Sequence, residues 1–388
     1  VGRAVVNLAY LVRCAGIEQN ALGQRGLAGI HVGRYTDIPD VRQIRRFAHA
    51  NRTAVITDLV AKKRSASFGP VSGSADRGAW GLASLILLSM LMIASAGAAT
   101  YALPPAGEGL VGQAFYVKSR HEDTLLDIAR RHGLGIDEIQ QANPGVDLWL
   151  PGEGADILIP AQHVLPDAPR RGIVLNLAEK RLYYFPKPQG DEPPQVITHP
   201  ISIGREGWST PVGSFHIVTK QKDPAWYPPA SIRAEHEENG DPLPTVVPPG
   251  PDNPLGQYAL RLSARGYLIH GTNKPWGVGM EVSHGCIRMY PENIETLFPV
   301  VAKGTPVTIV DQPYKVGWYQ GKLYLEVHVE DEEWRRDLLD SALDDAGRGG
   351  NAEVDWQAVQ AAQLENIGLP RVVGGQRLEA GDHLYMIF

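Results

Sequence analysis

Cys286, one of two cysteines in the chain, lies among residues that favour thiol chemistry. It belongs to the run SHGCIR (residues 283–288), sixteen positions after His270 in the run HGT (residues 270–272). A thiol attacks as its thiolate, so it needs a base and a group that stabilises the resulting ion pair. His270 and His284 are the candidate bases. A solitary cysteine is usually an inert apolar residue, but this combination predicts a nucleophile for acyl transfer.

The residues beside this pair supply the other groups that acyl transfer needs. Gly285 allows a tight bend, so the backbone N–H groups around Gly285 and Cys286 are expected to converge as an oxyanion hole. Arg288 adds a positive charge that favours a thiolate and can pair with a substrate carboxylate. Ser283 and Thr272 flank the two histidine positions, and we expect both to contact the substrate.

Residues 82–98 (LASLILLSMLMIASAGA) form the one long apolar stretch of the sequence. Arg77 precedes this stretch and small residues close it, which is the layout of a secretory signal peptide. We therefore expect a signal peptide at 77–98, cleavage before Ala99, and export. An uncleaved membrane anchor is the alternative, which the short apolar core and the lack of a basic stop-transfer run disfavour. Residues 1–76 are either a cytoplasmic extension or the product of a misassigned translation start, and we assign them no function.

Composition excludes several classes of protein. Cleavage removes Cys14, which leaves no disulfide partner for Cys286 within the chain. Residues 1–98 hold 12 of the 37 basic and 5 of the 43 acidic residues, so residues 99–388 carry a net charge of −13. Such an acidic surface disfavours binding to a phosphate backbone, and we expect no nucleic-acid partner. Because we find no metal-ligand spacing, phosphate loop or nucleotide fingerprint, we expect neither a cofactor nor a metal.

The pattern of elements predicts three domains after residue 98. Residues 113–161 read β-α-α-β, with a first helix capped by Asp123 or Thr124. Residues 171–311 are rich in short strands and turns, with one short helix over 292–301, so we expect a mainly β domain. Residues 312–388 add a strand pair, two helices and a final strand, which predicts a small α/β appendage of unknown role. Residues 99–112, rich in glycine and proline, are expected to form a flexible linker.

Residues 223–256 are rich in proline and show little periodicity. A connection this long within a compact domain is usually functional, so we expect a lid or a wall of the substrate site. Trp226 and Tyr227 within it either pack on the substrate or anchor the loop itself.

The β-α-α-β unit, with its D-T-L turn, its IQQANPG stretch and its final ILIP, resembles the LysM module. The resemblance implies a small α+β fold that binds glycans containing N-acetylglucosamine, such as peptidoglycan strands. A LysM-like unit that only packs against its neighbour is the alternative.

The run YLIHGTNKPWGVGMEVSHGCIRM (residues 267–289) resembles the catalytic domain of the L,D-transpeptidases, of the YkuD type, and the similarity extends over about residues 113–328. The resemblance implies a β-sandwich in which Cys286 is the acyl-enzyme nucleophile and His270 is the general base. It also implies that the carbonyl of Gly271 orients the base. His284 and Gly285 correspond to the residues that shape the oxyanion site. The family often has asparagine two places after the cysteine, and this chain departs from that pattern.

The resemblance implies a periplasmic enzyme that acts on peptidoglycan. The donor is a tetrapeptide stem: Cys286 attacks the carbonyl of diaminopimelate at position three, and D-alanine leaves. Similarity to enzymes that attach a Braun-type lipoprotein favours a lysine of an outer-membrane lipoprotein as the acceptor. A second stem, which gives a 3→3 cross-link, and water, which gives an L,D-carboxypeptidase, are the alternatives.

Two rival functions come from other classes. The first is a glycan-binding wall protein with an inactive site, against which the intact Cys286 and His270 argue. The second is a papain-like protease, but in that class the nucleophile comes early and the histidine follows far downstream, the reverse of the order here.

Overall fold

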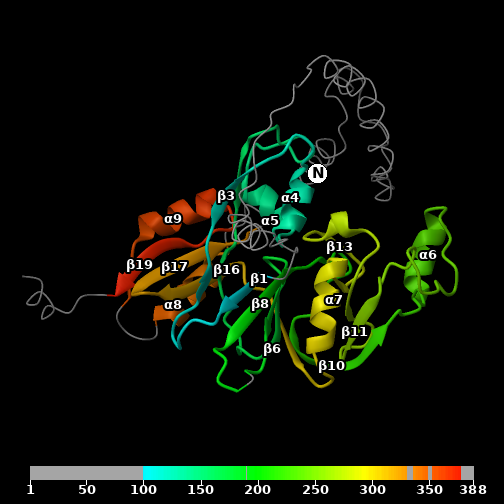
Figure 1. The fold of residues 1–388 in the computed structure, drawn as a ribbon. Coiled ribbons are helices and arrows are strands. Elements are labelled where there is room, and N and C mark those ends of the chain that lie inside the picture. Colours follow the sequence, from blue (N-terminus) through cyan, green and yellow to red (C-terminus); the bar gives the residue numbers. More distant parts are fainter. Residues whose placement is uncertain (1–98, 189, 330–334, 348–351, 377–388) are drawn as a thin grey trace, which may run out of the picture. The chain divides into compact units, whose positions relative to one another are not determined.

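The computed structural model describes residues 99–188, 190–329, 335–347 and 352–376 (Figure 1). The expected signal peptide at 77–98 and the extension at 1–76 lie outside these described residues. None of the helices in the described ranges has the length and hydropathy that a membrane-spanning helix requires. The described chain contains a large central sheet, a small N-terminal β-α-α-β unit, and a C-terminal sheet with two helices.

Nine strands form the central sheet, in the order β1-β8-β7-β6-β15-β10-β11-β12-β14. Neighbouring strands are antiparallel except for the pairs β6–β15 and β12–β14, which are parallel. The nine strands are β1 (Ala99–Ala102), β6 (Gly172–Asn176), β7 (Arg181–Phe185), β8 (Gln195–Pro200), β10 (Gly213–Lys222), β11 (Tyr258–Leu262), β12 (Leu268–His270), β14 (Ile287–Arg288) and β15 (Pro306–Val310).

A bulge in β10 divides this sheet into two parts that share one core. The first half of β10 pairs with β15, and its second half pairs with β11 after a register shift between Ile217 and Thr219. Such a bulge bends the strand that carries it. Side chains from both parts and from helix α7 (Pro291–Val300) form a single apolar cluster. The domain is mainly β, as predicted, and its two parts belong to one continuous sheet.

The N-terminal unit has the predicted β-α-α-β order. Thr124 begins the first helix through a capping box with Asp127, which satisfies two backbone N–H groups. The Asn143 side chain ends the second helix and bonds to the backbone of Leu158 in both directions, at 2.8 and 2.7 Å. The buried apolar side chains of this unit form a core of their own. Its elements are β3 (Phe115–Lys118), α4 (Leu125–Arg131), α5 (Ile136–Ala142) and β4 (Asp156–Ile159), with β3 antiparallel to β4.

Residues 99–112, expected to be a flexible linker, contain two short strands joined by a turn. β1 pairs with β8 along its whole length, and β2 (Leu110–Gly112) pairs with β5 (Gln162–Val164). Tyr101 packs against a second apolar cluster that contains buried Val111. An edge strand tolerates alternate exposed residues and prolines beside it. A glycine- and proline-rich composition therefore did not distinguish an edge strand from a linker.

The C-terminal residues form a four-stranded sheet in the order β16-β17-β19-β18. Helix α8 packs on β16, and helix α9 packs on β17 and β19. Buried Leu323, Leu325 and Val373 belong to a core of their own, so the predicted strand pair, two helices and final strand make a small packed unit (Figure 1). Its elements are β16 (Tyr314–Tyr319), β17 (Lys322–Val327), α8 (Arg336–Gly347), β18 (Ala352–Val354), α9 (Trp356–Glu365) and β19 (Arg371–Gln376).

Three short elements and one helix complete the described chain. β9 (Ile203–Gly204) pairs in parallel with β13 (Glu281–Ser283), and a 3₁₀ turn, η2 (Pro275–Gly277), precedes β13. Helix α6 (Ala230–Glu238) lies within the long 223–256 segment. Asn253, which is fully buried, ties the base of that segment by donating from its side chain to the carbonyls of Pro224 and Pro248.

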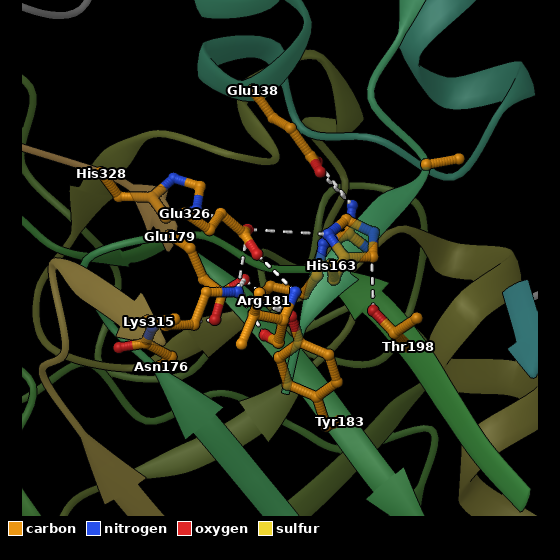
Figure 2. Close-up of polar contacts among 12 residues, drawn as sticks. Glu138, His163, Asn176, Glu179, Arg181, Tyr183, Thr198, Lys315, Glu326 and His328 are labelled. Carbon is orange, nitrogen blue, oxygen red and sulfur yellow. Dashed lines mark hydrogen bonds and ion pairs between the residues drawn. The ribbon is translucent and has the colours of Figure 1, made fainter. Parts of the chain in front are cut away.

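A buried network of charges links the C-terminal sheet to the central sheet (Figure 2). Lys315 Nζ lies 2.6 Å from Glu179 and 2.9 Å from Glu326, and it donates to the Val164 carbonyl at 2.8 Å. His328 Nε2 lies 2.7 Å from the same carboxylate of Glu326. Burial raises the pKa of Glu326, but the Lys315 charge and His328 outweigh burial and leave that pKa below its usual value.

A second buried pair links the N-terminal unit to the central sheet. Arg181 on β7 is 1% exposed, and its guanidinium lies 2.5 Å from the carboxylate of Glu138 on α5. It also donates to the Thr198 hydroxyl at 2.7 Å, and Figure 2 shows Arg181 between these two partners. A buried guanidinium is tolerated because its fork of donors is satisfied.

Candidate active site

Two short parallel strands bring the predicted catalytic residues together. β12 ends at His270 and β14 ends at Arg288, and these two residues are direct partners in the parallel ladder. The Met289 N–H donates to the His270 carbonyl at 2.9 Å, which fixes the register. Cys286 comes immediately before β14, two positions before Arg288. Residues two apart in a strand point to the same face, so this register puts Cys286 and Arg288 on the face of the sheet that holds His270.

The His270 ring is held in one orientation. Its Nδ1 lies 2.6 Å from the Gly271 carbonyl oxygen, so the neutral ring carries its proton on Nδ1 and donates it there. That leaves Nε2 as a proton acceptor. Burial and the Arg288 charge lower the pKa of His270 to about 3, against the opposing effect of the carbonyls of Gly271 and Leu255. His270 is therefore a neutral base at neutral pH.

Cys286 is half-buried, and its thiol faces backbone atoms of the preceding strand connection. Its Sγ lies 3.6 Å from the Gly266 carbonyl. Burial raises the pKa of Cys286, although the N–H of Leu268 and the charges of Arg288 and Arg261 oppose the rise. The expectation that Arg288 favours a thiolate is right in sign, but desolvation is the larger effect. The resting pair is a neutral thiol with a neutral imidazole, and the thiol must lose its proton as it attacks.

The buried side chain of Ser283 stabilises the turn that carries Cys286. Ser283 is fully buried, and its hydroxyl donates to the Cys286 carbonyl at 2.6 Å while accepting from the Gly285 N–H at 3.1 Å. Gly285 has a φ of 97°, a conformation that favours glycine. Ser283 was expected to contact the substrate, whereas the structure commits its side chain to the backbone of the turn.

The bond from Gly285 to Ser283 narrows the choice of oxyanion donors. The Gly285 N–H, expected as one of two donors, is already used inside the turn. The Cys286 N–H meets no hydrogen-bond acceptor among the residues that the structure describes. The Cys286 N–H is therefore the better candidate to bind a developing oxyanion, because a donor bonded to Ser283 would have to break that bond first.

The loop over residues 204–210 also stabilises this turn. We did not assign that loop to the site from the sequence. The Thr210 hydroxyl donates to the Gly285 carbonyl at 2.9 Å and accepts from the Gly204 N–H at 3.0 Å. A Cβ on Gly204 would lie 2.9 Å from the Gly285 Cα, so the two backbones are in direct contact. In the sequence this loop is the run PISIGREGWSTPVG (residues 200–213), whose residues we assigned no role.

His284 belongs to the same support and does not act on the thiol through its Nε2. The Arg205 guanidinium lies 3.1 Å from His284 Nε2, and because arginine can only donate, this nitrogen is an acceptor. Trp208 packs edge-on against the His284 ring, with ring centroids 4.9 Å apart. Of the two candidate bases, His270 is the one whose ring is oriented for proton transfer. His284 shapes the wall beside the turn.

Arg288 has no carboxylate partner among the described residues, although it is half-buried. Burial lowers the pKa of Arg288, and the neighbouring charge of Arg205 adds to this effect. Burial favours an anionic partner for such a charge, because charges removed from water are normally paired. The arrangement fits the expectation that Arg288 binds a carboxylate of the substrate.

Thr272 and the base of the 223–256 segment hold the loop after His270. Thr272 is 4% exposed, and its hydroxyl accepts from the Lys274 N–H at 3.0 Å. A Cβ on Gly256 would lie 2.9 Å from the Thr272 nitrogen. Gly271 is equally confined, since a Cβ there would lie 3.2 Å from Ile294. Thr272, like Ser283, uses its hydroxyl in a hydrogen bond to the backbone of its own loop.

One group of potential metal ligands lies outside this site. The ligand atoms of His163, Glu179 and Glu326 fall within 4.8 Å of one another. Lys315 Nζ makes ion pairs with both glutamates at 2.6 and 2.9 Å. A lysine ammonium thus takes the place that a cation would need, and these residues do not form a metal site.

Comparison with known proteins agrees with this geometry. A family model described as the L,D-transpeptidase catalytic domain (YkuD) matches residues 170–309. The chain is 46% identical over 235 residues to the protein named Probable L,D-transpeptidase YcfS of Escherichia coli K12, covering 59% of this chain and 72% of that one. It is 44% identical over 238 residues to Probable L,D-transpeptidase YbiS of the same organism, covering 60% of this chain and 76% of that one.

Solved structures are more distant. The catalytic domain of an Enterococcus faecium L,D-transpeptidase is 24% identical and matches 37% of this chain and 99% of that one, at a TM-score of 0.27. L,D-transpeptidase 3 of Mycobacterium tuberculosis is 20% identical and matches 40% of this chain and 67% of that one, at a TM-score of 0.26. The sequence matches carry the family assignment. With identities near 45% over most of the length of such relatives, this chain belongs to the L,D-transpeptidase family.

Proposed function

We propose that this protein is a periplasmic L,D-transpeptidase that acts on peptidoglycan tetrapeptide stems through a thioester on Cys286. The observation that carries the proposal is the parallel pairing of β12 with β14. This pairing joins a neutral, oriented His270 to the strand that Cys286 precedes. Neither residue alone would argue for catalysis, because a lone buried thiol and a satisfied histidine are both common.

The first step forms the thioester. His270 Nε2 takes the thiol proton as Sγ attacks the carbonyl of diaminopimelate at position three of the stem. The tetrahedral intermediate collapses with breakage of the bond to the terminal D-alanine. The same imidazole, now protonated, gives its proton to the leaving amine. The Gly271 carbonyl, 2.6 Å from Nδ1, favours the transient positive charge on the ring.

The neighbouring groups stabilise charge on the substrate. The Cys286 N–H donates to the oxyanion, in a turn that Ser283 and Thr210 keep rigid. Arg288 pairs with a carboxylate of the stem peptide. The substrate thus supplies the anionic partner that this arginine lacks in the free protein. Both contacts form only when substrate is bound, so they act on the reaction more than on the stability of the fold.

The second step transfers the acyl group to an amine. We propose the side-chain amine of a C-terminal lysine on an outer-membrane lipoprotein as the acceptor. The amine attacks the thioester carbonyl, His270 takes the proton from the attacking nitrogen, and the Cys286 thiol is regenerated. A second stem would give a 3→3 cross-link at the same step, and water would give a tripeptide.

The other parts of the chain have supporting roles in this proposal. Residues 77–98 direct export, residues 113–161 form a LysM module that binds the glycan strand, and residues 171–311 form the catalytic domain. The 223–256 segment forms a wall of the substrate site, since its base at Leu255 and Gly256 lies against residues 270–272. Residues 312–388 form the C-terminal appendage.

Product analysis tests the proposal. The protein is incubated with a tetrapeptide muropeptide and a lysine-ending peptide, and the products are identified by mass spectrometry. The proposal predicts a muropeptide–peptide adduct with loss of D-alanine, absent with Cys286→Ala. Cross-linked dimers alone would change the acceptor to a second stem, and tripeptide alone would make the enzyme a carboxypeptidase. No product with Cys286 reduced would favour a glycan-binding protein.

A further inference from the structure

The N-terminal unit contacts the catalytic segment on both sides of Cys286. On the entry side, the Ile136 N–H at the start of α5 donates to the Val278 carbonyl at 3.0 Å. This N–H belongs to the first turn of the helix, where backbone donors lack partners within the helix. Val278 lies three residues before β13, which leads directly into the turn that carries Cys286.

Two buried glycines make this entry contact unusually close. A Cβ on Gly135 would lie 2.7 Å from the Cα of Gly279, where 3.4–4 Å is ordinary contact. A Cβ on Gly279 would lie 2.4 Å from the Cα of Gly135 and 2.5 Å from the nitrogen of Ile136. The backbones therefore touch without any intervening side chain, and movement of one is transmitted to the other.

On the exit side, two residues that follow β14 bind the same unit. The Tyr290 hydroxyl, on a side chain that is 4% exposed, donates to the Leu134 carbonyl at 3.1 Å. Glu292 accepts two bonds from Arg130 on α4, each 2.8 Å long. Because the planar guanidinium of Arg130 donates through two of its nitrogens, this pair restricts both the distance and the relative orientation of the two side chains.

The segment is held from its other flank by β9. The Ile203 N–H donates to the Met280 carbonyl at 3.2 Å, and the Arg205 N–H donates to the Ser283 carbonyl at 3.0 Å. The segment that enters the catalytic turn thus contacts the N-terminus of α5 at Val278 and Gly279, and it contacts residues 203–205 from Met280 to Ser283. Without the N-terminal unit, the beginning of this segment would lose its backbone contacts.

We propose that Gly135 and Tyr290 are positioning residues for the transfer reaction, through which the N-terminal unit sets the place of Cys286 relative to His270. The unit is then part of the framework of the active site, whether or not it also binds glycan. This inference rests on the proposed role of Cys286 as nucleophile. Reactive groups displaced by about 1 Å can lose on the order of 100-fold in rate.

Gly135→Ala is the sharpest test, because the backbone at Gly135 (φ −81°, ψ 162°) suits alanine. Only the approach of Gly279 opposes the new methyl group. Gly277→Ala is the matched control: a Cβ there meets one atom, Val282 Cγ2, at the ordinary distance of 3.6 Å. The full chain of each variant is assayed for kcat and KM with a tetrapeptide muropeptide, for the rate of acylation by a carbapenem, and for its thermal unfolding midpoint.

The proposal predicts that Gly135→Ala lowers kcat and the acylation rate about 100-fold, with KM unchanged and a cooperative unfolding transition retained. Gly277→Ala should stay within about twofold of the wild type. A folded Gly135→Ala variant with wild-type kcat and acylation rate would overturn the inference, because a purely structural contact changes the unfolding midpoint alone.

Tyr290→Phe keeps the inference testable if Gly135→Ala fails to fold. It removes one hydroxyl, keeps the ring, and should lower kcat about fivefold at an unchanged KM. A folded Tyr290→Phe variant with unchanged kcat, beside an unfolded Gly135→Ala variant, would also overturn the inference. Failure of the proposed function looks different, since the wild type itself would then form no product and no carbapenem adduct.

Discussion

Two regions of this protein withdraw charged groups from water, and they treat those groups in opposite ways. In the buried network, Lys315 lies between the carboxylates of Glu179 and Glu326, at 2.6 and 2.9 Å. In the catalytic region, Arg288 is half-buried near Cys286 and His270 and has no carboxylate partner among the described residues. In the first region every charged group named here has a partner within the protein. In the second region, Arg288 gains a carboxylate partner only when a ligand binds.

The difference separates groups that hold the fold from groups that await a substrate. A buried ion pair with all its donors satisfied fixes how elements meet, even where its net contribution to stability is small. A partly buried charge without a partner costs stability and is found more often where chemistry occurs. Substitutions in the two regions should therefore change different quantities.

The largest effect is expected for His270→Gln, which removes the base and keeps a polar side chain. We expect kcat/KM to fall about 10²–10⁴-fold, with little loss of stability because glutamine can still bond to the Gly271 carbonyl. His216→Gln, at an exposed position on β10, is the control. A His270→Gln variant with more than a tenth of wild-type activity would mean that another group accepts the thiol proton.

Lys315→Met should lower the stability of the fold and leave catalysis unchanged, the opposite of His270→Gln. Removing one partner leaves two buried carboxylates without their cation, which typically costs about 3–5 kcal/mol in the free energy of unfolding. Because the network lies away from Cys286, kcat of the folded variant should remain close to the wild-type value. Denaturant unfolding measures the loss, with exposed Lys322→Met on the adjacent strand as the control. Unchanged stability would remove the contrast between the two regions.

Arg288→Gln sharpens the comparison. Loss of a charge-assisted hydrogen bond to the substrate is worth about 1.5–3 kcal/mol, so kcat/KM should fall about 10- to 150-fold. Stability should stay the same or rise, because the change removes a half-buried charge that lacks an anion. Steady-state kinetics and urea unfolding on the same samples, with exposed Arg265→Gln as the control, measure both quantities. Lower stability at wild-type activity would assign Arg288 to the fold instead.

The dependence of stability on pH should be the most gradual effect. Burial lowers the pKa of both His270 and His199 to about 3, with help from Arg288 and Arg181 respectively. Their pKa in the unfolded chain is near 6.5. Between these values the unfolded chain binds more protons, so the free energy of unfolding is highest above pH 6.5 and declines as the pH falls toward 3.

Urea unfolding at several pH values between 7 and 4 checks this decline. His270→Gln should show a smaller decline than the wild type, since one of the buried histidines with a lowered pKa is then absent. Equal slopes for the two proteins would mean that His270 is not held neutral in the folded state.

Short-range features of the site could be read from the sequence, and long-range ones could not. His270 and Cys286 were identified because their motifs are local and specific. Thr210 and Arg205 were missed because their partners, Gly285 and His284, lie 75 and 79 positions away. A pattern of neighbouring residues does not predict contacts between positions so far apart in the sequence. The ion pair between Lys315 and Glu179, 136 positions apart, was invisible for the same reason.

Residue type alone did not show which groups the hydroxyls of Ser283 and Thr272 bind in the fold. Ser283 and Thr272 sit beside the catalytic residues in the sequence, and a hydroxyl next to a nucleophile reads as a substrate ligand. In the fold both side chains turn inward to satisfy backbone groups, as serine and threonine often do in turns. Strand β1 was misread because its composition is that of a linker, while its pairing with β8 depends on residues 195–198.

The measurement that tests the central claim most directly is the intact mass of the protein after incubation with a tetrapeptide muropeptide alone. Without an acceptor, the acyl-enzyme should accumulate as a mass increase equal to the muropeptide minus D-alanine. Hydroxylamine should remove this adduct, and peptide mapping should place it on Cys286. Release of D-alanine without any adduct on Cys286, or an adduct that persists in Cys286→Ala, would contradict the account.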